Sequence, residues 1–289
     1  MKKWIAALIL IFFPFSTLTS EAKGGEVYIA LGDSIAAGQT PDRAIDSGYT
    51  DLIAQELTRS HQLTYYSKAL AFPGYTTADV LKTVRTKEAK ELLKNVTVVT
   101  ISAGANDLLR LVQVNPSNGS IAYQQVQVNF ALNNVRKNIA EVIQEVQATT
   151  PKAKIYIMGY YFPYPHLRDS QKVGIKKQLE TMNTILKTEA EANGAIYVTV
   201  EEAFKGNEKE LLPNPADVHP TMEGYRLMAN AFFKQYNGRL QVNPNELPAP
   251  NPLTFEQILN RQKELPKSPV SKIQGFDQYL GLTKLKPYI

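Results

Sequence analysis

Short apolar runs alternate along this chain with longer stretches in which apolar residues recur every three to four positions. The short runs are rich in β-branched residues and indicate strands, whereas the longer stretches have the spacing of amphipathic helices. The clearest strand is 96–101, which is apolar enough to be buried on both faces of a sheet. The pattern predicts strands at 27–31, 63–69, 96–101, 154–158 and 196–200, and helices at 48–59, 76–85, 124–147, 172–192 and 221–236.

The alternation of strands and helices predicts an α/β fold, with helices on both faces of a parallel sheet. A polar turn is expected at 115–120, before the long helix at 124–147. In a parallel sheet all carboxyl ends of the strands lie at one edge, and ligands bind there. Polar residues that directly follow the strands are therefore the first candidates for chemistry.

The first 22 residues are predicted to be a signal peptide. Lys2 and Lys3 precede an almost continuous apolar run, 4–15, and Ser20 and Ala22 are small residues at the two positions that a signal peptidase reads. The alternative is an uncleaved membrane anchor, but the run is short for a span of about 20 residues and contains a proline. We expect cleavage after Ala22 and a secreted or extracytoplasmic protein.

The composition changes after residue 240, which divides the rest of the chain into two parts. Residues 23–240 carry the alternating pattern and form the predicted catalytic domain. Residues 241–289 contain frequent prolines, one short helical pattern at 254–263 and an apolar end at 276–288. We expect this second part to be an appendage that packs in part on the main domain.

Charge and cysteine content narrow the classes of function. The net charge is +5 and the sequence pI is about 9.1, which favours peripheral association with an anionic membrane or cell wall. The basic residues are scattered rather than gathered with aromatic residues, which argues against nucleic acid as a partner. There is no cysteine, so disulfides, thiolate metal sites and a cysteine nucleophile are excluded.

Polar residues with complementary chemistry follow the predicted strands or precede the last helix. Ser34 comes just after the first strand, Asn106 after the third, and His219 just before the helix at 221–236. A serine needs a nearby general base to become a nucleophile, and an imidazole can supply it. Of the three histidines, His61 and His166 lie outside these segments, so His219 is the predicted base.

Four short segments resemble the conserved blocks of one enzyme family. They are Gly32-Asp33-Ser34 followed by Gly38, the isolated Gly74, the segment 104–107 of the form Gly-x-Asn-Asp, and His219-Pro220. Together, and in this order, they resemble the SGNH hydrolase superfamily, also called the GDSL esterase/lipase family, in its bacterial secreted type. The resemblance covers about 27–236.

The resemblance implies a three-layer α/β/α sandwich of the flavodoxin-like type, with a five-stranded parallel sheet. It also implies ester hydrolysis in which Ser34 is the nucleophile and His219 the base. The implied oxyanion hole consists of the backbone N–H groups of Ser34 and Gly74 and the side-chain amide of Asn106. No metal ion and no cofactor are expected.

The chain departs from the family pattern beside the histidine. The family usually places an aspartate three residues before it, but Ala216 occupies that position here and Asp217 is two residues before. Asp217 is our prediction for the residue that orients His219. The alternative is a backbone carbonyl, such as that of Ala216, which would also fix the tautomer of the imidazole.

The sequence therefore predicts a secreted serine hydrolase that acts on a small-molecule, lipid or glycan ester. Two alternatives remain open at this point. One is an O-deacetylase acting on carbohydrate of the cell envelope. The other is a protein without enzymatic activity that binds glycan or lipid on the same scaffold. The aromatic stretch 160–164 can form the wall of an acyl pocket or simply pack at the surface.

Overall fold

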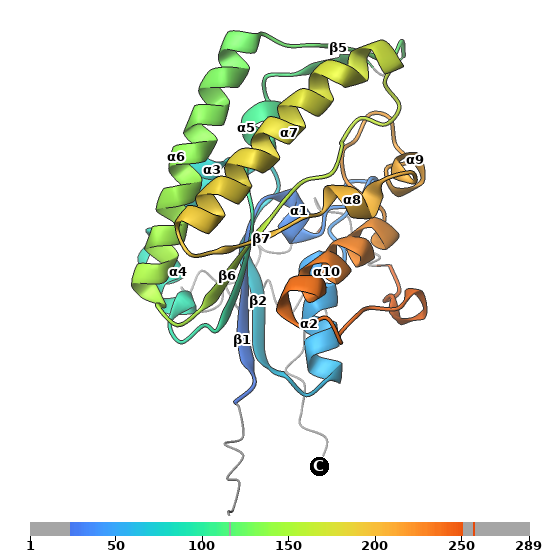
Figure 1. Ribbon diagram of the computed structural model, residues 1–289. Helices are drawn as coiled ribbons and strands as arrows, with labels where there is room; N and C mark the ends of the chain where they lie inside the picture. Colours follow the sequence, from blue (N-terminus) through green and yellow to red (C-terminus); the bar gives the residue numbers. More distant parts are fainter. Residues whose placement is uncertain (1–23, 116, 251–256, 258–289) are drawn as a thin grey trace, which may run out of the picture.

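The computed structural model describes residues 24–115, 117–250 and 257 of the 289-residue chain. Its centre is a five-stranded parallel sheet in the order β2-β1-β3-β6-β7 (Figure 1). All five predicted strands are present, which confirms the sheet. Their bounds are β1 Glu26–Gly32, β2 Leu63–Ala71, β3 Val98–Ser102, β6 Lys154–Met158 and β7 Ile196–Val198.

Helices cover both faces of the sheet, so the three-layer sandwich of the flavodoxin-like type is confirmed as well (Figure 1). On one face, α6 contacts its neighbours α3, α4 and α7; on the other face, α10 contacts α2 and α8. The first group comprises α3 Thr77–Val84, α4 Lys87–Leu93, α6 Gln125–Thr149 and α7 Asp169–Ala192. The second comprises α2 Tyr49–Arg59, α8 Glu201–Phe204 and α10 Met222–Tyr236.

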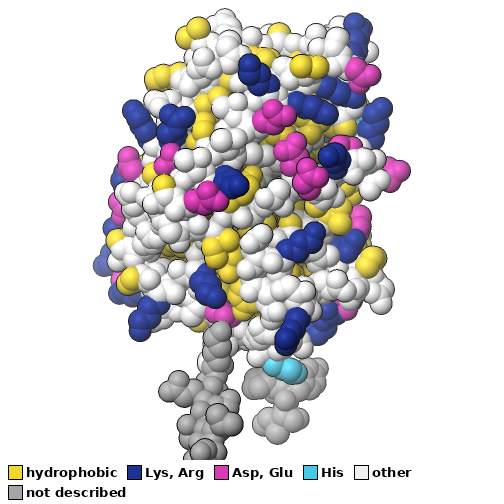
Figure 2. Space-filling view, in the orientation of Figure 1, with side chains coloured by type: hydrophobic (Ala, Val, Ile, Leu, Met, Phe, Trp, Pro, Cys, Tyr) yellow, Lys and Arg dark blue, Asp and Glu magenta, His cyan; other side chains and the backbone are white. Residues whose placement is uncertain are grey.

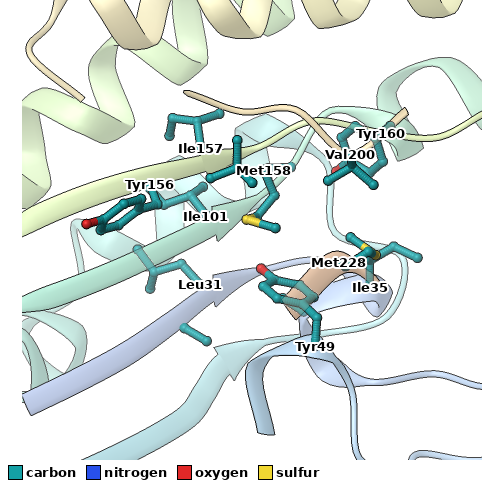
Figure 3. Packing of buried hydrophobic residues seen from close by; sticks show 14 of the residues in the cluster. Leu31, Ile35, Tyr49, Ile101, Tyr156, Ile157, Met158, Tyr160, Val200 and Met228 are labelled. Atoms are coloured by element: carbon teal, nitrogen blue, oxygen red, sulfur yellow. The ribbon is translucent and has the colours of Figure 1, made fainter. Parts of the chain in front are cut away.

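The core lies between these layers and is built from the apolar runs of the strands. Leu31, Ile101 and Ile157 occupy matching register positions on β1, β3 and β6, and none is more than 1% exposed (Figure 3). Burying one such side chain typically contributes about 1.5–3 kcal/mol. This burial on both faces explains why β3 and most of β1 appear in the sequence as continuous apolar runs.

Several short elements are not predicted by the periodicity because they are only one or two turns long. Helix α4 buries only Ala89 and Leu93, and its other residues are mostly charged, so it has no repeating apolar pattern. The polar turn expected at 115–120 lies at the tip of a small antiparallel hairpin. The remaining elements are α1 Ser34–Ala37, α5 Ala105–Leu109, β4 Gln113–Asn115, β5 Ser120–Ala122, α9 Glu208–Leu211 and the 3-10 helix Pro244–Glu246.

A charged side chain is buried between α1, α2 and β2. Lys68 of β2 is fully buried, and its ammonium donates hydrogen bonds to Asp51 Oδ2 (2.5 Å), Ala37 O (2.9 Å) and Asp46 O (3.2 Å). Losing one partner of a buried ion pair typically costs about 3–5 kcal/mol, because the other charge is left without compensation. Lys68 therefore fixes the end of α1 and the loop that follows it against the sheet.

Residues 241–247 pack against the outside of α2 and α10. Val242 is buried, and its backbone N–H and carbonyl are both hydrogen-bonded to the side chain of Asn230. Gln55 of α2 donates to the carbonyl of Glu246. The helix predicted at 254–263, the apolar end at 276–288 and the predicted signal peptide lie outside the described residues.

Basic side chains are spread over the surface rather than gathered in one patch on the face shown in Figure 2, where Lys and Arg alternate with Asp and Glu. In the part of the chain that the structure describes, no helix is both long enough and apolar enough to cross a membrane.

Candidate active site

Ser34 is positioned by a sharp turn at the carboxyl end of β1. Gly32 has φ of 137°, and a Cβ at this position would lie 2.0 Å from the carbonyl oxygen of Ser102 on the neighbouring strand. Only glycine allows this approach of the two backbones. Asp33 then caps α1 by accepting a hydrogen bond from the backbone N–H of Ile35, and Ser34 is the first residue of the helix.

His219 and Asp217 lie directly beside Ser34. The Oγ of Ser34 is 2.7 Å from Nε2 of His219, and Nδ1 of His219 is 2.6 Å from Oδ1 of Asp217. The side chains of His219 and Asp217 are only 10% and 11% exposed. The structure thus brings a hydroxyl, an imidazole and a carboxylate into one chain of contacts, in the geometry of a Ser-His-Asp triad.

The short spacing between Asp217 and His219 is accommodated by a tight local turn. Oδ1 of Asp217 accepts a hydrogen bond from the backbone N–H of His219 (2.8 Å) as well as contacting its ring. This is the geometry of an Asx turn, in which the carboxylate bonds the backbone two residues on. The group that faces Nδ1 is therefore the carboxylate of Asp217, and not the carbonyl of Ala216.

The loop that carries His219 is held on both sides. The hydroxyl of Tyr161 donates to the carbonyl of Val218 (2.8 Å). After His219, Pro220 packs so closely on the first turn of α10 that a Cβ at Gly224 would lie 2.6 Å from it. The imidazole is consequently positioned by packing and backbone contacts, and not by its own hydrogen bonds alone.

The three predicted oxyanion donors come from α1, from α5 and from the turn at Gly74 between β2 and α3. The N–H of Ser34 is in the first turn of α1, where backbone N–H groups have no partner within the helix. Asn106 lies on α5 and lines the same cavity as Ser34. Its Nδ2 donates to the carbonyl of Tyr75 (2.9 Å), and Arg110 donates to the carbonyl of Gly74 (2.5 Å). These two bonds hold α5 against the turn at Gly74.

Asp107, the last residue of the Gly-x-Asn-Asp segment, has a structural role, because it connects α5 to α3. Its carboxylate accepts hydrogen bonds from the backbone N–H (2.9 Å) and the hydroxyl (2.8 Å) of Thr77, the first residue of α3. Asn138 of α6 donates to the same hydroxyl. Asp107 therefore fixes α5 relative to α3 and α6, and so fixes the position of Asn106.

Sequence reasoning missed the role of Asp33, which forms a buried network directly behind the nucleophile. The carboxylate is 1% exposed and accepts hydrogen bonds from Tyr160 Oη (2.6 Å) and Ser102 Oγ (3.1 Å). Burial raises the pKa of Asp33 to about 6, although these hydrogen bonds oppose the shift. Burial and the nearby carboxylate raise the pKa of Tyr160, so its hydroxyl remains a donor. An aspartate just before a short helix was the available signal.

The other two histidines do not contact Ser34. His61 follows α2 in the left-handed region, with φ of 54°. Nε2 of His166 is hydrogen-bonded to the carbonyl of Leu212 (2.8 Å), and His166 lines a small cavity of about 280 Å³ that also borders Asp217. Within the described ranges, no group of three or more His, Asp or Glu side chains is arranged to hold a metal ion.

A larger cavity of about 770 Å³, part of which is open to solvent, begins at Ser34. Tyr160, Tyr161 and Tyr164 of the aromatic stretch line it, whereas Phe162 packs beneath the ammonium of Lys176, which lies 5.5 Å from the ring centre. Most of the aromatic stretch thus contributes to the wall of a pocket. A pocket lined mainly by apolar and aromatic side chains, with a few polar groups, is the usual form of a small-ligand site.

Comparison with known families decides the identity of this fold and site. The sequence model of the GDSL-like lipase/acylhydrolase family matches residues 30–227, more than half of the chain. The chain belongs to this family. The matched region includes Ser34, Gly74, Asn106 and His219, so the resemblance seen in the four short segments is confirmed. Because the family consists of ester hydrolases, this GDSL hydrolase is a carboxylic ester hydrolase, and the alternative of a purely binding protein is set aside.

Known relatives of the GDSL hydrolase are distant but extend over most of its length. The spore germination lipase LipC of Bacillus licheniformis is 23% identical over 221 residues, which cover 74% of this chain and 98% of that protein.

Two solved structures are similar in fold. The lipase Lip_vut3 from a goat rumen metagenome has a TM-score of 0.59 and 21% identity, and covers 74% of this chain and 99% of its own. The acetylxylan esterase Axe2 of Geobacillus stearothermophilus has a TM-score of 0.53 and 20% identity. The match covers 74% of this chain and 95% of the Axe2 chain.

The buried carboxyl of Asp33 should make stability depend on pH in a recognisable way. Its pKa is raised from 3.8 to about 6 in the fold, so ionisation opposes folding as pH rises through this range. Asp33→Asn removes the ionisable group and, with it, the free-energy cost of ionisation in the folded state. The unfolding free energy of the variant minus that of the wild type should therefore increase by about 2 kcal/mol between pH 4 and pH 7 in urea titrations.

Asp79→Asn is the control with the opposite sign. Hydrogen bonds from Thr76 lower the pKa of Asp79, so its ionisation favours the fold. The unfolding free energy of Asp79→Asn minus that of the wild type should therefore decrease as pH rises through the acid range. A difference for Asp33→Asn that does not change between pH 4 and pH 7 would contradict the raised pKa.

Proposed function

We propose that the protein is a secreted serine hydrolase that cleaves carboxylic esters through an acyl-enzyme intermediate. The observation that carries the proposal is the contact chain from Ser34 Oγ through His219 to Asp217, with distances of 2.7 and 2.6 Å. Membership of a family of ester hydrolases supports the same chemistry. No metal ion or organic cofactor enters the proposed steps.

In the first step, Ser34 attacks the ester carbonyl and His219 takes the proton of its hydroxyl. The carboxylate of Asp217 accepts the Nδ1–H of the imidazole, so that the lone pair of Nε2 faces the hydroxyl. As the imidazole gains the proton, the carboxylate also stabilises the positive charge. A bond forms between Oγ and the carbonyl carbon, and the carbonyl oxygen becomes an oxyanion.

The oxyanion is stabilised by the N–H groups of Ser34 and Gly74 and by the side-chain amide of Asn106. Asn106 uses one amide hydrogen for the carbonyl of Tyr75 and has a second for the oxyanion. When the intermediate collapses, the bond to the alcohol breaks and His219 donates its proton to the departing oxygen. A water molecule, deprotonated by His219, then releases the acid and restores Ser34.

Asn106→Ala tests both the function and the oxyanion assignment. Purified wild-type protein should hydrolyse p-nitrophenyl esters, and Ser34→Ala should remove this activity. Asn106→Ala should lower kcat by about 100- to 1,000-fold, because one donor to the developing charge is lost. Unfolding curves serve as the control for an intact fold. A normal kcat in Asn106→Ala would exclude this residue from the oxyanion hole.

Asp217→Asn tests the orienting role of the carboxylate. An amide at this position can donate to Nδ1 and favour the wrong tautomer; in a serine protease triad the same change lowers kcat by about 10,000-fold. We expect a loss of this order, with KM for a p-nitrophenyl ester little changed. A loss of only a few fold would show that the aspartate does not orient the imidazole and would favour another partner for Nδ1.

We also propose that the protein is exported and cleaved after Ala22. The support is the charged start, the apolar run 4–15 and the small residues at the cleavage positions. Expressed in a bacterium with a general secretion pathway, the protein should be recovered outside the cytoplasmic membrane with Lys23 as its first residue. N-terminal sequencing checks this, and an extracytoplasmic protein that retains Met1 would indicate the uncleaved anchor instead.

A further inference from the structure

The cavity that begins at Ser34 extends away from the triad between helices α5, α6 and α7. Its wall includes residues of all three helices as well as Ser34, so it is not confined to the immediate surroundings of the nucleophile. The three helices contribute almost only apolar side chains to its wall. These are Leu108 and Leu109 of α5, Val128 of α6, and Ile175, Leu179 and Met182 of α7.

Two of the four tyrosines that line this cavity already use their hydroxyl protons within the protein. Tyr160 donates its hydroxyl proton to Asp33 (2.6 Å), and Tyr161 donates to the carbonyl of Val218 (2.8 Å). Each hydroxyl has a single proton to donate, so neither is left as a donor to a ligand. A sugar hydroxyl placed against Tyr160 or Tyr161 would therefore find no donor there, which carries a cost.

Gln178, which with Asn106 is one of two polar residues on the helical wall, is also paired within the protein. Gln178 of α7 and Gln125 of α6 exchange hydrogen bonds, at 3.1 and 3.4 Å between the amide nitrogen of each and the amide oxygen of the other. This reciprocal pair uses a donor and an acceptor of each amide and links the two helices. The helical part of the wall is therefore suited to hydrocarbon and offers few free polar atoms.

We propose that this cavity is the acyl-chain site and that the preferred substrates are esters of straight-chain fatty acids rather than acetyl esters. The inference rests on the proposed function, because the acyl carbonyl must sit at Ser34 Oγ for its chain to enter between α5, α6 and α7. The alcohol part of the ester then points away from the helices, toward solvent. The acyl group of the substrate in the proposed reaction is then a straight fatty-acid chain.

The wild-type protein provides the first test. A series of p-nitrophenyl esters from acetate through butyrate and hexanoate to octanoate should be compared below the concentrations at which they aggregate. Burial of each added methylene should raise kcat/KM about fourfold until the cavity is filled. The rates are divided by those of hydroxide hydrolysis, which corrects for the intrinsic reactivity of each ester. A series that is flat or that favours acetate would overturn the proposal.

Two substitutions on one helix provide a matched pair. Val128 is 2% exposed and lines the cavity, whereas Val126, two residues earlier on α6, is 81% exposed. Val128→Phe should lower the ratio of kcat/KM for octanoate to that for acetate by roughly tenfold, because the ring occupies space for about two methylenes. Val126→Phe adds the same ring outside the cavity and should leave this ratio unchanged.

Leu109→Phe on α5 gives a second variant in case the ring at Val128 prevents folding. Leu109 is only partly buried at the cavity wall, so a larger side chain can be accommodated with less disturbance of the core. It should lower the octanoate-to-acetate ratio in the same direction. An unchanged ratio in a folded Val128→Phe or Leu109→Phe protein contradicts an acyl chain in this cavity.

Reaction with a fluorophosphonate probe separates failure of this inference from failure of the proposed function. If Ser34 does not react with the probe and no ester is hydrolysed, the serine-hydrolase mechanism itself is wrong, and the acyl site falls with it. If Ser34 is labelled but acetylated glycans are cleaved faster than fatty esters, the mechanism stands and the acyl-chain site is refuted.

Discussion

The contact between Ser34 Oγ and His219 Nε2 joins segments that are 185 residues apart in the chain. Neither residue can make it alone, since a hydrogen bond needs its two atoms within a few tenths of an ångström of the right separation. One end is set by the approach of β1 to β3 at Gly32, and the other by the loop that packs on α10. The sheet and the helices on both faces therefore act together as the support of one short bond.

A second feature is a buried carboxyl group next to that bond. Asp33 shapes the turn that presents Ser34, and it is buried where ionisation is unfavourable. Tyr160 and Ser102 offset part of this cost by donating hydrogen bonds, and a positive charge on His219 lowers the pKa of Asp33 further. The same residue thus links local backbone geometry with the electrostatics of the site.

The sequence predicted those features that leave a local pattern. Apolar runs located the central strands most clearly, because burial on both faces removes polar residues from them, and short motifs after the strands or before the last helix pointed to Ser34, Asn106 and His219. It did not predict α4, whose two buried residues are too few for a period. It also could not assign partners to Asp33 or Lys68, because an acid or a base in a local pattern does not reveal which distant atoms surround it. The turn that brings Asp217 to the imidazole depends on backbone angles that spacing alone does not specify.

The strap formed by residues 241–247 has a practical consequence for where the protein can be shortened. Its composition sets it apart from the catalytic domain, yet Val242 is bound through both backbone groups to Asn230 of α10, the helix whose first turn supports the histidine loop. A version ending at residue 240 would expose the flank of α10 and leave Asn230 without these partners. The packing on α2 and α10 therefore continues past the change in composition at residue 240, through Glu246.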